Sequence, residues 1–142
     1  MADRKAPRLG LERGSDYRVV SVSTIEFVIP GRAVPRSRPR VRYGQRAYYP
    51  ERYEVWRTTA KLIARSAAQY TLALWEGPVR VKARFYYKGR ADADNLMSAV
   101  FDVLTGSVLR DDRQVTEFHG YKIPDKDERV EVRVELLEEA IK

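Results

Sequence analysis

Residues 79–104, VRVKARFYYKGRADADNLMSAVFDVL, hold the clearest structural pattern of the chain. Apolar and mostly charged side chains alternate over residues 79–87, which is the period of a strand with one buried face. After a short basic turn, residues 95–104 are mainly apolar and predict a helix that ends at Thr105-Gly106. This strand and helix form the centre of the predicted fold.

The segments before this centre predict two further elements. Residues 17–29 are rich in Val, Ile, Ser and Thr, which favours one strand or two short ones. Pro50 stands where a helix over residues 51–72 would begin. The expected buried stripe of that helix consists of Trp56, Ala60, Ile63, Ala67 and Tyr70.

The last third of the chain predicts a hairpin. Residues 115–123 and 129–136 have strand composition, and a Pro-Asp-Lys-Asp turn joins them. Residues 107–109 are expected to form a brief strand, and residues 138–142 a tail or one helical turn. The predicted fold is therefore α+β, with β-α-β-α-β-β order and two main helices on one face of a mixed sheet of about four strands.

Length and composition define the class of protein. The 142 residues fit one domain, assigned to residues 17–142, behind a polar stretch at 1–16 that is expected to be a flexible tail. The absence of Cys and the single His exclude disulfides, thiolate zinc sites and multi-histidine metal sites. Because no apolar signal core or bilayer-spanning run is present, we expect a soluble, cytoplasmic protein with no membrane partner.

Charge is distributed unevenly along the chain. The net charge is +7, yet residues 91–112 hold five Asp against one Arg, a net −4, so the remainder carries +11. A strongly basic balance favours a polyanionic partner, and nucleic acid is the commonest. Carboxylates beside a polyanion need a reason, and a bound divalent cation is such a reason.

The most basic stretch is residues 32–46, which no acid interrupts. Pro35 and Pro39 favour an extended backbone that would spread its arginines along a phosphate backbone, although a solvated basic loop is the alternative. A row of cations on the first predicted helix, completed by Arg65, could continue this track or form a solvated face. The candidate DNA-binding residues are Arg32, Arg36, Arg38, Arg40, Arg42, Arg46, Arg57 and Lys61.

The acidic residues form two candidate clusters. If this segment is extended, we expect Asp92 and Asp94 to share a face, with Cα atoms about 6.6 Å apart, so that both carboxylates can converge on one hard cation. Capping of the following helix could also explain Asp94 and Asn95, but it does not explain Asp92. Asp111-Asp112 is either a second part of the same site or an exposed turn. Four carboxylates in one partly dry cleft would repel one another unless Mg²⁺ bound them.

These groups suit phosphodiester hydrolysis. A carboxylate-bound ion lowers the pKa of an attacking water and stabilises the leaving 3′ oxygen, and a nearby arginine or lysine offsets charge at phosphorus. Asp102 lies about 80° round the helix from Asp94, so it points partly toward this site or pairs with an arginine. His119 is expected to have a structural or surface role, and Trp56 and Trp75 are expected to lie in the core.

Several short motifs, taken in order, resemble those of the RusA-type Holliday-junction resolvases of bacteria and their prophages. They are residues 25–29 (IEFVI), Pro30-Gly31, Arg38-Pro39-Arg40, residues 92–96 (DADNL), residues 101–106 (FDVLTG) and residues 111–115 (DDRQV). The resemblance covers roughly residues 24–136. The ordered set is specific, whereas DxDN alone would not be.

The resemblance implies a homodimer that grips a four-way DNA junction. Each subunit would nick one of two opposed strands with Mg²⁺ or Mn²⁺ in DNA recombination and repair, without a small-molecule cofactor. By position, Asp92, Asp94 and Asp112 look like the family's metal-binding catalytic carboxylates, with Asp111 assisting them. Asn95 and Asp102 fall at supporting positions of the same motifs.

One position departs from the family's pattern. Members often carry a lysine four residues after the second Asp of the DxD, where this chain has Ser98. Lys88, Arg90 or an arginine of residues 32–46 would then have to supply the charge. Otherwise the chain would be a weak or inactive module that binds branched nucleic acid without cutting it. A protein that binds no nucleic acid would leave both the basic stretch and the acidic residues unexplained.

Overall fold

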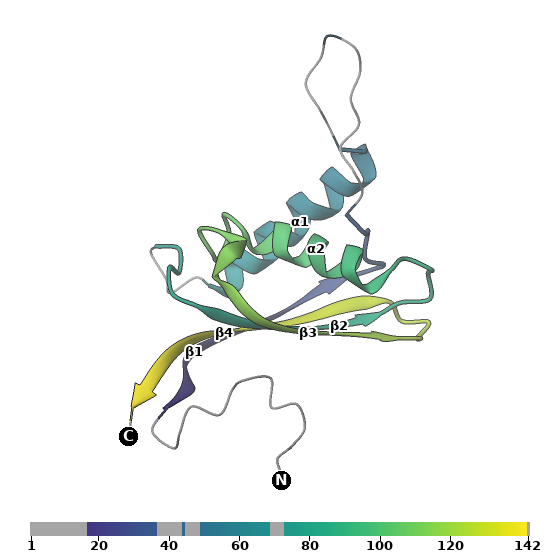
Figure 1. Cartoon of the computed structure of the whole chain (residues 1–142). Helices are drawn as coiled ribbons and strands as arrows, with labels where there is room; N and C mark the ends of the chain where they lie inside the picture. Colours follow the sequence, from purple (N-terminus) through teal and green to yellow (C-terminus); the bar gives the residue numbers. More distant parts are fainter. Residues whose placement is uncertain (1–16, 37–43, 45–48, 69–72, 142) are drawn as a thin grey trace.

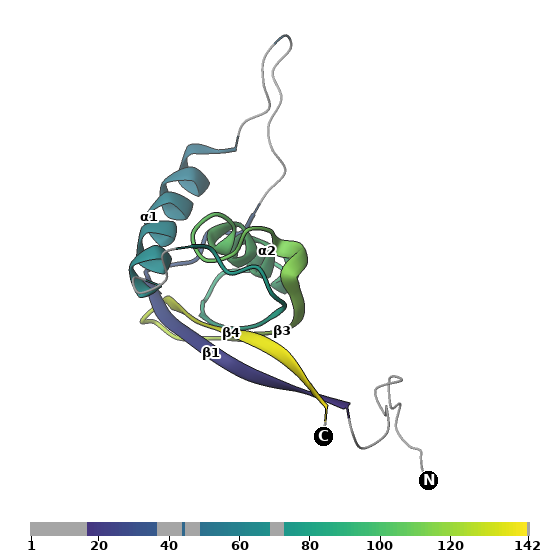
Figure 2. The ribbon, with the colours of Figure 1, turned by 90° about the vertical axis from the view of Figure 1, so that its left-hand side faces the viewer.

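The computed structural model describes residues 17–36, 44, 49–68 and 73–141. Its elements follow in the order β1 (Tyr17–Pro30), α1 (Glu51–Ala67), β2 (Val79–Tyr86), α2 (Ala93–Leu104), the 3₁₀ helix η1 (Asp112–Gln114), β3 (Val115–Ile123) and β4 (Arg129–Ile141). The predicted α+β class and β-α-β-α-β-β order are confirmed. Figure 1 and Figure 2 show both helices on one face of the four-stranded sheet.

The strand order corrects the predicted hairpin between the last two strands. Across the sheet the order is β1-β4-β2-β3, so β2 lies between β3 and β4. β3 pairs with β2 in parallel, whereas β4 pairs antiparallel with both β1 and β2. Because a parallel pair needs a crossover connection, α2 makes that connection on the helical face of the sheet.

Burial explains which of these two strands takes the centre. β4 turns Val130, Val132 and Val134 into the core, and none of them is more than 3% exposed. In contrast, β3 has no buried residue and leaves Phe118 and Tyr121 56% and 54% exposed. The edge position leaves one side of the β3 backbone unpaired within the sheet, so β3 is an open edge strand.

α2 lies antiparallel along β3. A Cβ atom on Gly120 would be only 2.8 Å from Sδ of Met97, and the rings of Phe101 and Phe118 meet edge-on with centroids 5.4 Å apart. Residues four apart on the helix thus face residues two apart on the strand, because both steps advance about 6–7 Å. The start of α2 therefore lies at the C-terminal end of β3, and the end of α2 lies at its beginning.

α1 packs on the same face as α2. Its buried side chains are Tyr53, Trp56, Ala60 and Ala64. Ile63 and Ala67 are partly buried against this core, and Tyr70 of the predicted stripe lies outside the described residues. α1 ends at Ala67, before the predicted end at residue 72.

Other element ends also differ from the sequence expectation. β1 is one strand with a register shift between Ser21 and Ser23. Residues 107–109 form no strand, only bridges at Leu109. β4 continues to Ile141 because it pairs with β1 up to Tyr17, so the predicted tail or helical turn over residues 138–142 is wrong for its described part.

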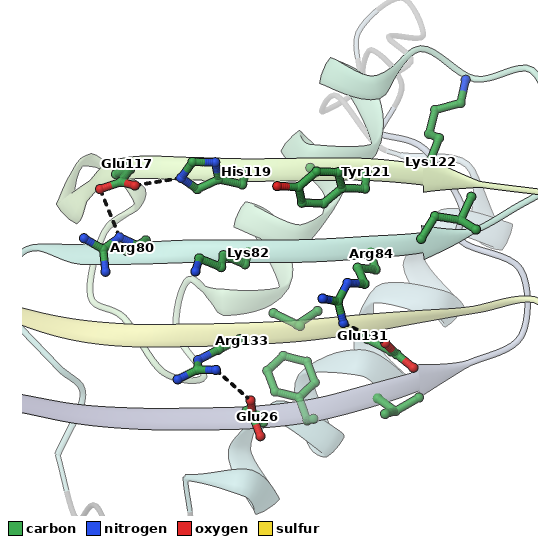
Figure 3. A pocket seen from close by; sticks show the side chains of 15 residues that line it. Glu26, Arg80, Lys82, Arg84, Glu117, His119, Tyr121, Lys122, Glu131 and Arg133 are labelled. Carbon is green, nitrogen blue, oxygen red and sulfur yellow. Dashed lines mark hydrogen bonds and ion pairs between the residues drawn. The ribbon is translucent and has the colours of Figure 1, made fainter. Parts of the chain in front are cut away.

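The other face of the sheet is open and carries rows of charge (Figure 3). Arg80 lies 2.9 Å from Glu117, whose carboxylate also contacts the His119 ring at 2.7 Å. His119 therefore has the surface role expected for it. Within the described residues, neither helix combines the length and hydrophobicity that crossing a bilayer requires.

Candidate functional site

The start of α2 presents two carboxylates to solvent. Asp92 occupies the N-cap position in an extended conformation (φ −69°, ψ 147°), yet its side chain makes no capping hydrogen bond. Asp94 lies in the first turn, where Oδ1 accepts a hydrogen bond from the backbone N–H of Asn95 at 2.9 Å. Asp92, Asp94 and Asn95 are all exposed. The helix N-terminus favours negative charge here, and capping does not account for the Asp92 carboxylate.

Two hydrogen bonds fix the chain just before these carboxylates. The backbone N–H of Tyr87 donates to the carbonyl oxygen of Ile123 at 2.9 Å. The ammonium group of Lys122 donates to the carbonyl oxygen of Ala91 at 2.8 Å. The segment that leads into Asp92 is therefore anchored to the end of β3, and the Lys122 cation lies next to it.

Asp111 and Asp112 lie in the turn at the beginning of β3. Asp111 caps η1: its Oδ1 accepts from the backbone N–H of Arg113 at 2.8 Å, and its Oδ2 lies 2.9 Å from the Arg113 guanidinium. These hydrogen bonds lower the pKa of Asp111 to about 2. Asp112 is exposed. The Asp111 carboxylate is therefore occupied by capping and by an ion pair, whereas the Asp92 carboxylate makes no capping hydrogen bond.

A single chain does not bring all of these carboxylates together. α2 starts at the C-terminal end of β2 and β3, and η1 precedes β3, so Asp92 and Asp112 lie at opposite ends of the crossover unit. The 12 residues of α2 span about 18 Å. Among the described residues, no group of three Asp, Glu or His side chains is placed to hold a metal ion.

Asp102 lies apart from this pair, in contact with α1. The Tyr53 hydroxyl donates to its Oδ2 at 2.6 Å, and the guanidinium groups of Arg36 and Arg57 lie 3.4 Å and 3.6 Å from the same oxygen. Burial, followed by the hydrogen bond to Asp102, raises the pKa of Tyr53. Of the two expectations for Asp102, the structure shows the pairing with arginine.

The basic candidates differ in what they contact. The Nε–H of Arg32 is shared between the two carboxylate oxygens of Glu128, each at 3.0 Å. Arg57 pairs with Glu54 and Asp102, and Lys61 donates to the carbonyl oxygen of Thr105 at 2.7 Å. Burial, with the nearby charge of Arg57, lowers the pKa of Lys61. Lys88 and Arg90 are exposed, whereas Arg38, Arg40, Arg42 and Arg46 lie outside the described residues.

The sequence interpretation missed two structural roles. Tyr53 was not singled out, although residues 53, 56, 60 and 64 follow helical spacing and would have placed it in the buried stripe. Gln114 caps η1 together with Asp111: its Oε1 accepts from the backbone N–H groups of Arg110 and Asp111 at 2.9 and 3.0 Å. The Asp-x-x-Gln spacing at residues 111–114 is a capping-box pattern and could have shown this role.

The Asp92–Asp94 pair fits a hard divalent cation. Mg²⁺ prefers oxygen ligands, keeps several waters and is commonly held by one or two carboxylates together with substrate phosphates. Both carboxylates are exposed, and neither is paired with a cation in the described part of the chain. The chemistry of these two donors therefore suits such an ion.

Exposed carboxylates that could hold a divalent cation, in a domain that also carries exposed arginines, suit a protein that acts on a phosphodiester backbone. Residues 30–135 match the family model described as Endodeoxyribonuclease RusA. Because this match covers most of the chain, the protein belongs to the RusA endodeoxyribonuclease family, whose members are Holliday-junction resolvases. A comparison with curated proteins finds no match.

Proposed function

We propose that this chain is a metal-dependent, structure-selective endodeoxyribonuclease that resolves four-way DNA junctions by paired hydrolysis during recombination and repair. The observation that carries this proposal is the exposed pair Asp92 and Asp94 at the start of α2, with the Asp92 carboxylate unused by capping. The proposed cofactor is Mg²⁺, with Mn²⁺ as a substitute. The proposed setting is the cytoplasm of a bacterium, with a bacterial or phage gene as the source.

The chemistry divides between the ion and the chain. When bound, the metal lowers the pKa of an attacking water and stabilises the 3′ oxygen as the P–O3′ bond breaks. Asp92 and Asp94 would hold it with carboxylate oxygens. Arg36, beside the same helix, would bind a neighbouring phosphate, as would Arg32 and the arginines of residues 37–46. Water adds to phosphorus and the 3′ oxygen takes up a proton, which leaves a 5′-phosphate and a 3′-hydroxyl.

The third carboxylate is proposed to come from a second copy of the chain. β3 is an open edge strand, and its Phe118 and Tyr121 are more than half exposed. When two copies of one edge strand pair about a two-fold axis, the strands run antiparallel, so the start of one lies beside the end of the other. That pairing would bring Asp112 of the partner subunit toward Asp92 and Asp94, which one chain keeps apart.

Ser98 leaves open which residue supplies the catalytic cation. It lies on the same face of α2 as Asn95 and Asp102, because these positions are three and four residues apart. Arg36 passes along this face, and Lys88 and Arg90 are exposed in the loop before α2. The variant Ser98→Lys tests the point: an unchanged cleavage rate would mean that another cation already acts there.

The direct experiment is nicking of a labelled four-way junction beside a linear duplex of the same sequence, with Mg²⁺, Mn²⁺ or EDTA. We expect metal-dependent cuts near the branch point that Asp94→Asn abolishes. Asp127→Asn is the matched control, because Asp127 has 84% of its side chain exposed in the turn between β3 and β4. Cleavage that persists in EDTA or in Asp94→Asn would contradict the proposal.

The second candidate is a module that holds branched DNA without cutting it. The observation that favours it is that, among the described residues, no three carboxylates of one chain are grouped for a metal. Tight junction binding without cuts under any of the metals would establish this alternative.

A further inference from the structure

We propose that Asp102 and Tyr53 are positioning residues: together they hold the Arg36 guanidinium against α2, on the helix face that leads from Asn95 to Asp102, as a preset site for a DNA phosphate. This inference rests on the proposed function and specifies how part of its DNA contact is built.

Two contacts attach Arg36 to α2 at different heights. Its backbone N–H donates to the carbonyl oxygen of Asn95 at 3.1 Å, in the first turns of the helix. Its Nε lies 3.4 Å from Oδ2 of Asp102, two turns further on. Helical side chains lean toward the N-terminus, which brings the Asp102 carboxylate back toward Asn95. Arg36 therefore lies along the helix face that begins beside the proposed metal site.

Tyr53 fixes the carboxylate that holds Arg36. The Tyr53 side chain is 1% exposed, and its ring stacks with that of Trp56 in the core. Its hydroxyl reaches Asp102 at 2.6 Å, a short hydrogen bond to an ionised acceptor. The direction of the Asp102 carboxylate is thus set by a core residue of α1 and not by the exposed surface.

Asp102 also separates two like charges. The guanidinium of Arg57 lies 3.6 Å from the same oxygen that faces Arg36. Without the carboxylate, these two cations would repel each other across the space between α1 and α2. Without the attraction of Asp102, the Arg36 side chain would sample many rotamers. Binding a phosphate would then cost the conformational entropy of ordering this long side chain.

Arg36 retains capacity for a ligand. Its contacts within the described residues use Nε, toward Asp102, and Nη2, which donates to the Tyr49 hydroxyl at 3.2 Å. A guanidinium has five N–H donors in a fixed fork, and 40% of the Arg36 side chain is exposed. The remaining donors suit two-pronged binding of a phosphodiester.

The same contacts argue against a metal-binding role for Asp102. Its carboxylate, 18% exposed, already faces one hydroxyl donor and two guanidinium groups. Asp92 and Asp94 have no such cation partners in the described part of the chain. Asp102 therefore acts through Arg36 and does not join the metal-binding pair.

The test is a double-mutant cycle on junction affinity, measured by fluorescence anisotropy in EDTA so that cleavage plays no part. The variants are Arg36→Ala, Asp102→Asn and the pair combined, with Arg84→Ala as a matched control from the open sheet face, where its side chain is 61% exposed. We expect Arg36→Ala to weaken binding about tenfold and to lower the slope of log K against log salt by about 1, with Arg84→Ala near wild type. Asp102→Asn should weaken binding less, and the double variant should match Arg36→Ala within about twofold.

Additive losses in the cycle would overturn the proposal, because they would mean that Asp102 acts independently of Arg36. Mn²⁺ binding is measured separately by isothermal titration calorimetry without DNA. Its loss in Asp102→Asn would also overturn the proposal, because it would make Asp102 a metal ligand. If Asp102→Asn does not fold, Tyr53→Phe takes its place in the same cycle with the same expectation. A wild-type chain that binds no junction would contradict the proposed function itself, whereas additive losses with normal wild-type binding would contradict only this inference.

Discussion

The ammonium group of Lys122 and the carbonyl oxygen of Ala91 are joined by a hydrogen bond of 2.8 Å. This contact connects the C-terminal end of β3 to the segment that leads into Asp92. The position of the carboxylate pair therefore depends on the edge strand as well as on α2. The same edge strand is the surface that we propose pairs with a second copy, so dimer formation and the site would be mechanically connected.

Replacing Lys122 should loosen the entry to α2. We expect Lys122→Met to lower the nicking rate about tenfold at limiting metal, because a misplaced ligand pair costs orientation, while the thermal midpoint changes little. Lys126→Met, in the exposed turn after β3, is the matched control. An unchanged rate in Lys122→Met would show that the bond does not position the site.

Gln114 should be intolerant even of an isosteric change. Its Nε2 donates to the carbonyl oxygens of Trp75 and Gly77, both at 2.9 Å, while its Oε1 accepts two backbone N–H groups. We expect Gln114→Leu to cost about 2 kcal/mol in the free energy of unfolding, because these backbone groups lose their partners. Gln114→Glu should also destabilise, since a carboxylate cannot donate to two carbonyls. Urea unfolding of both variants checks this. An unchanged free energy of unfolding in Gln114→Glu would refute the hydrogen bonds assigned to Gln114.

Gly120 leaves room for the side chain of Met97. A Cβ at residue 120 would lie 2.8 Å from Sδ and 3.0 Å from Cγ of Met97, which is 4% exposed. We expect Gly120→Ala to cost about 1–2 kcal/mol through overpacking. In the double variant with Met97→Ala, the added methyl group should fill part of the space, so the two costs should not add. Additive costs would mean that α2 does not pack on β3 at this point.

Glu128 should give the protein an acid-sensitive component of stability. The hydrogen bond from the backbone N–H of Lys88 and the pairing with Arg32 lower the pKa of Glu128 below its ordinary value. Because the folded pKa lies below the unfolded one, this contribution is complete above about pH 4.5 and is lost as the pH falls through the folded value. Urea unfolding of wild type and Glu128→Gln at pH 7, 4.5 and 3 should show a difference that shrinks with acid. A difference that grows with acid would reverse the assigned sign.

Local patterns predicted the elements of the fold but not all of their neighbours. The alternation over residues 79–87 and the helical spacing of α2 depend on near neighbours in the chain, and both were predicted. The hairpin was wrong because β3 and β4 are adjacent in sequence, and strand composition does not show that β2 lies between them. What distinguishes the two strands is burial, because β4 has buried apolar side chains and β3 has none.

For the candidate site, too, the sequence could predict only what depends on near neighbours in the chain. From the sequence we expected Asp92 and Asp94 on one face of an extended segment, followed by a helix from Asn95. In the structure only Asp92 is extended, and Asp94 lies in the first turn of α2, which begins at Ala93. Where Asp112 lies relative to them depends on strand order, which no local pattern contains. The partners of Asp102 come from another helix, and only the periodicity of α1 hinted at Tyr53.

The central claim is that Asp92 and Asp94 of one chain and Asp112 of the partner subunit form each cutting site. Subunit complementation tests it most directly: Asp94→Asn and Asp112→Asn chains are co-produced with different tags, and the mixed dimer is purified. We expect each parent dimer to be inactive and the mixed dimer to nick four-way junctions with Mg²⁺ at about half the wild-type rate, because one of its two sites is intact. A mixed dimer as inactive as its parents would contradict the claim.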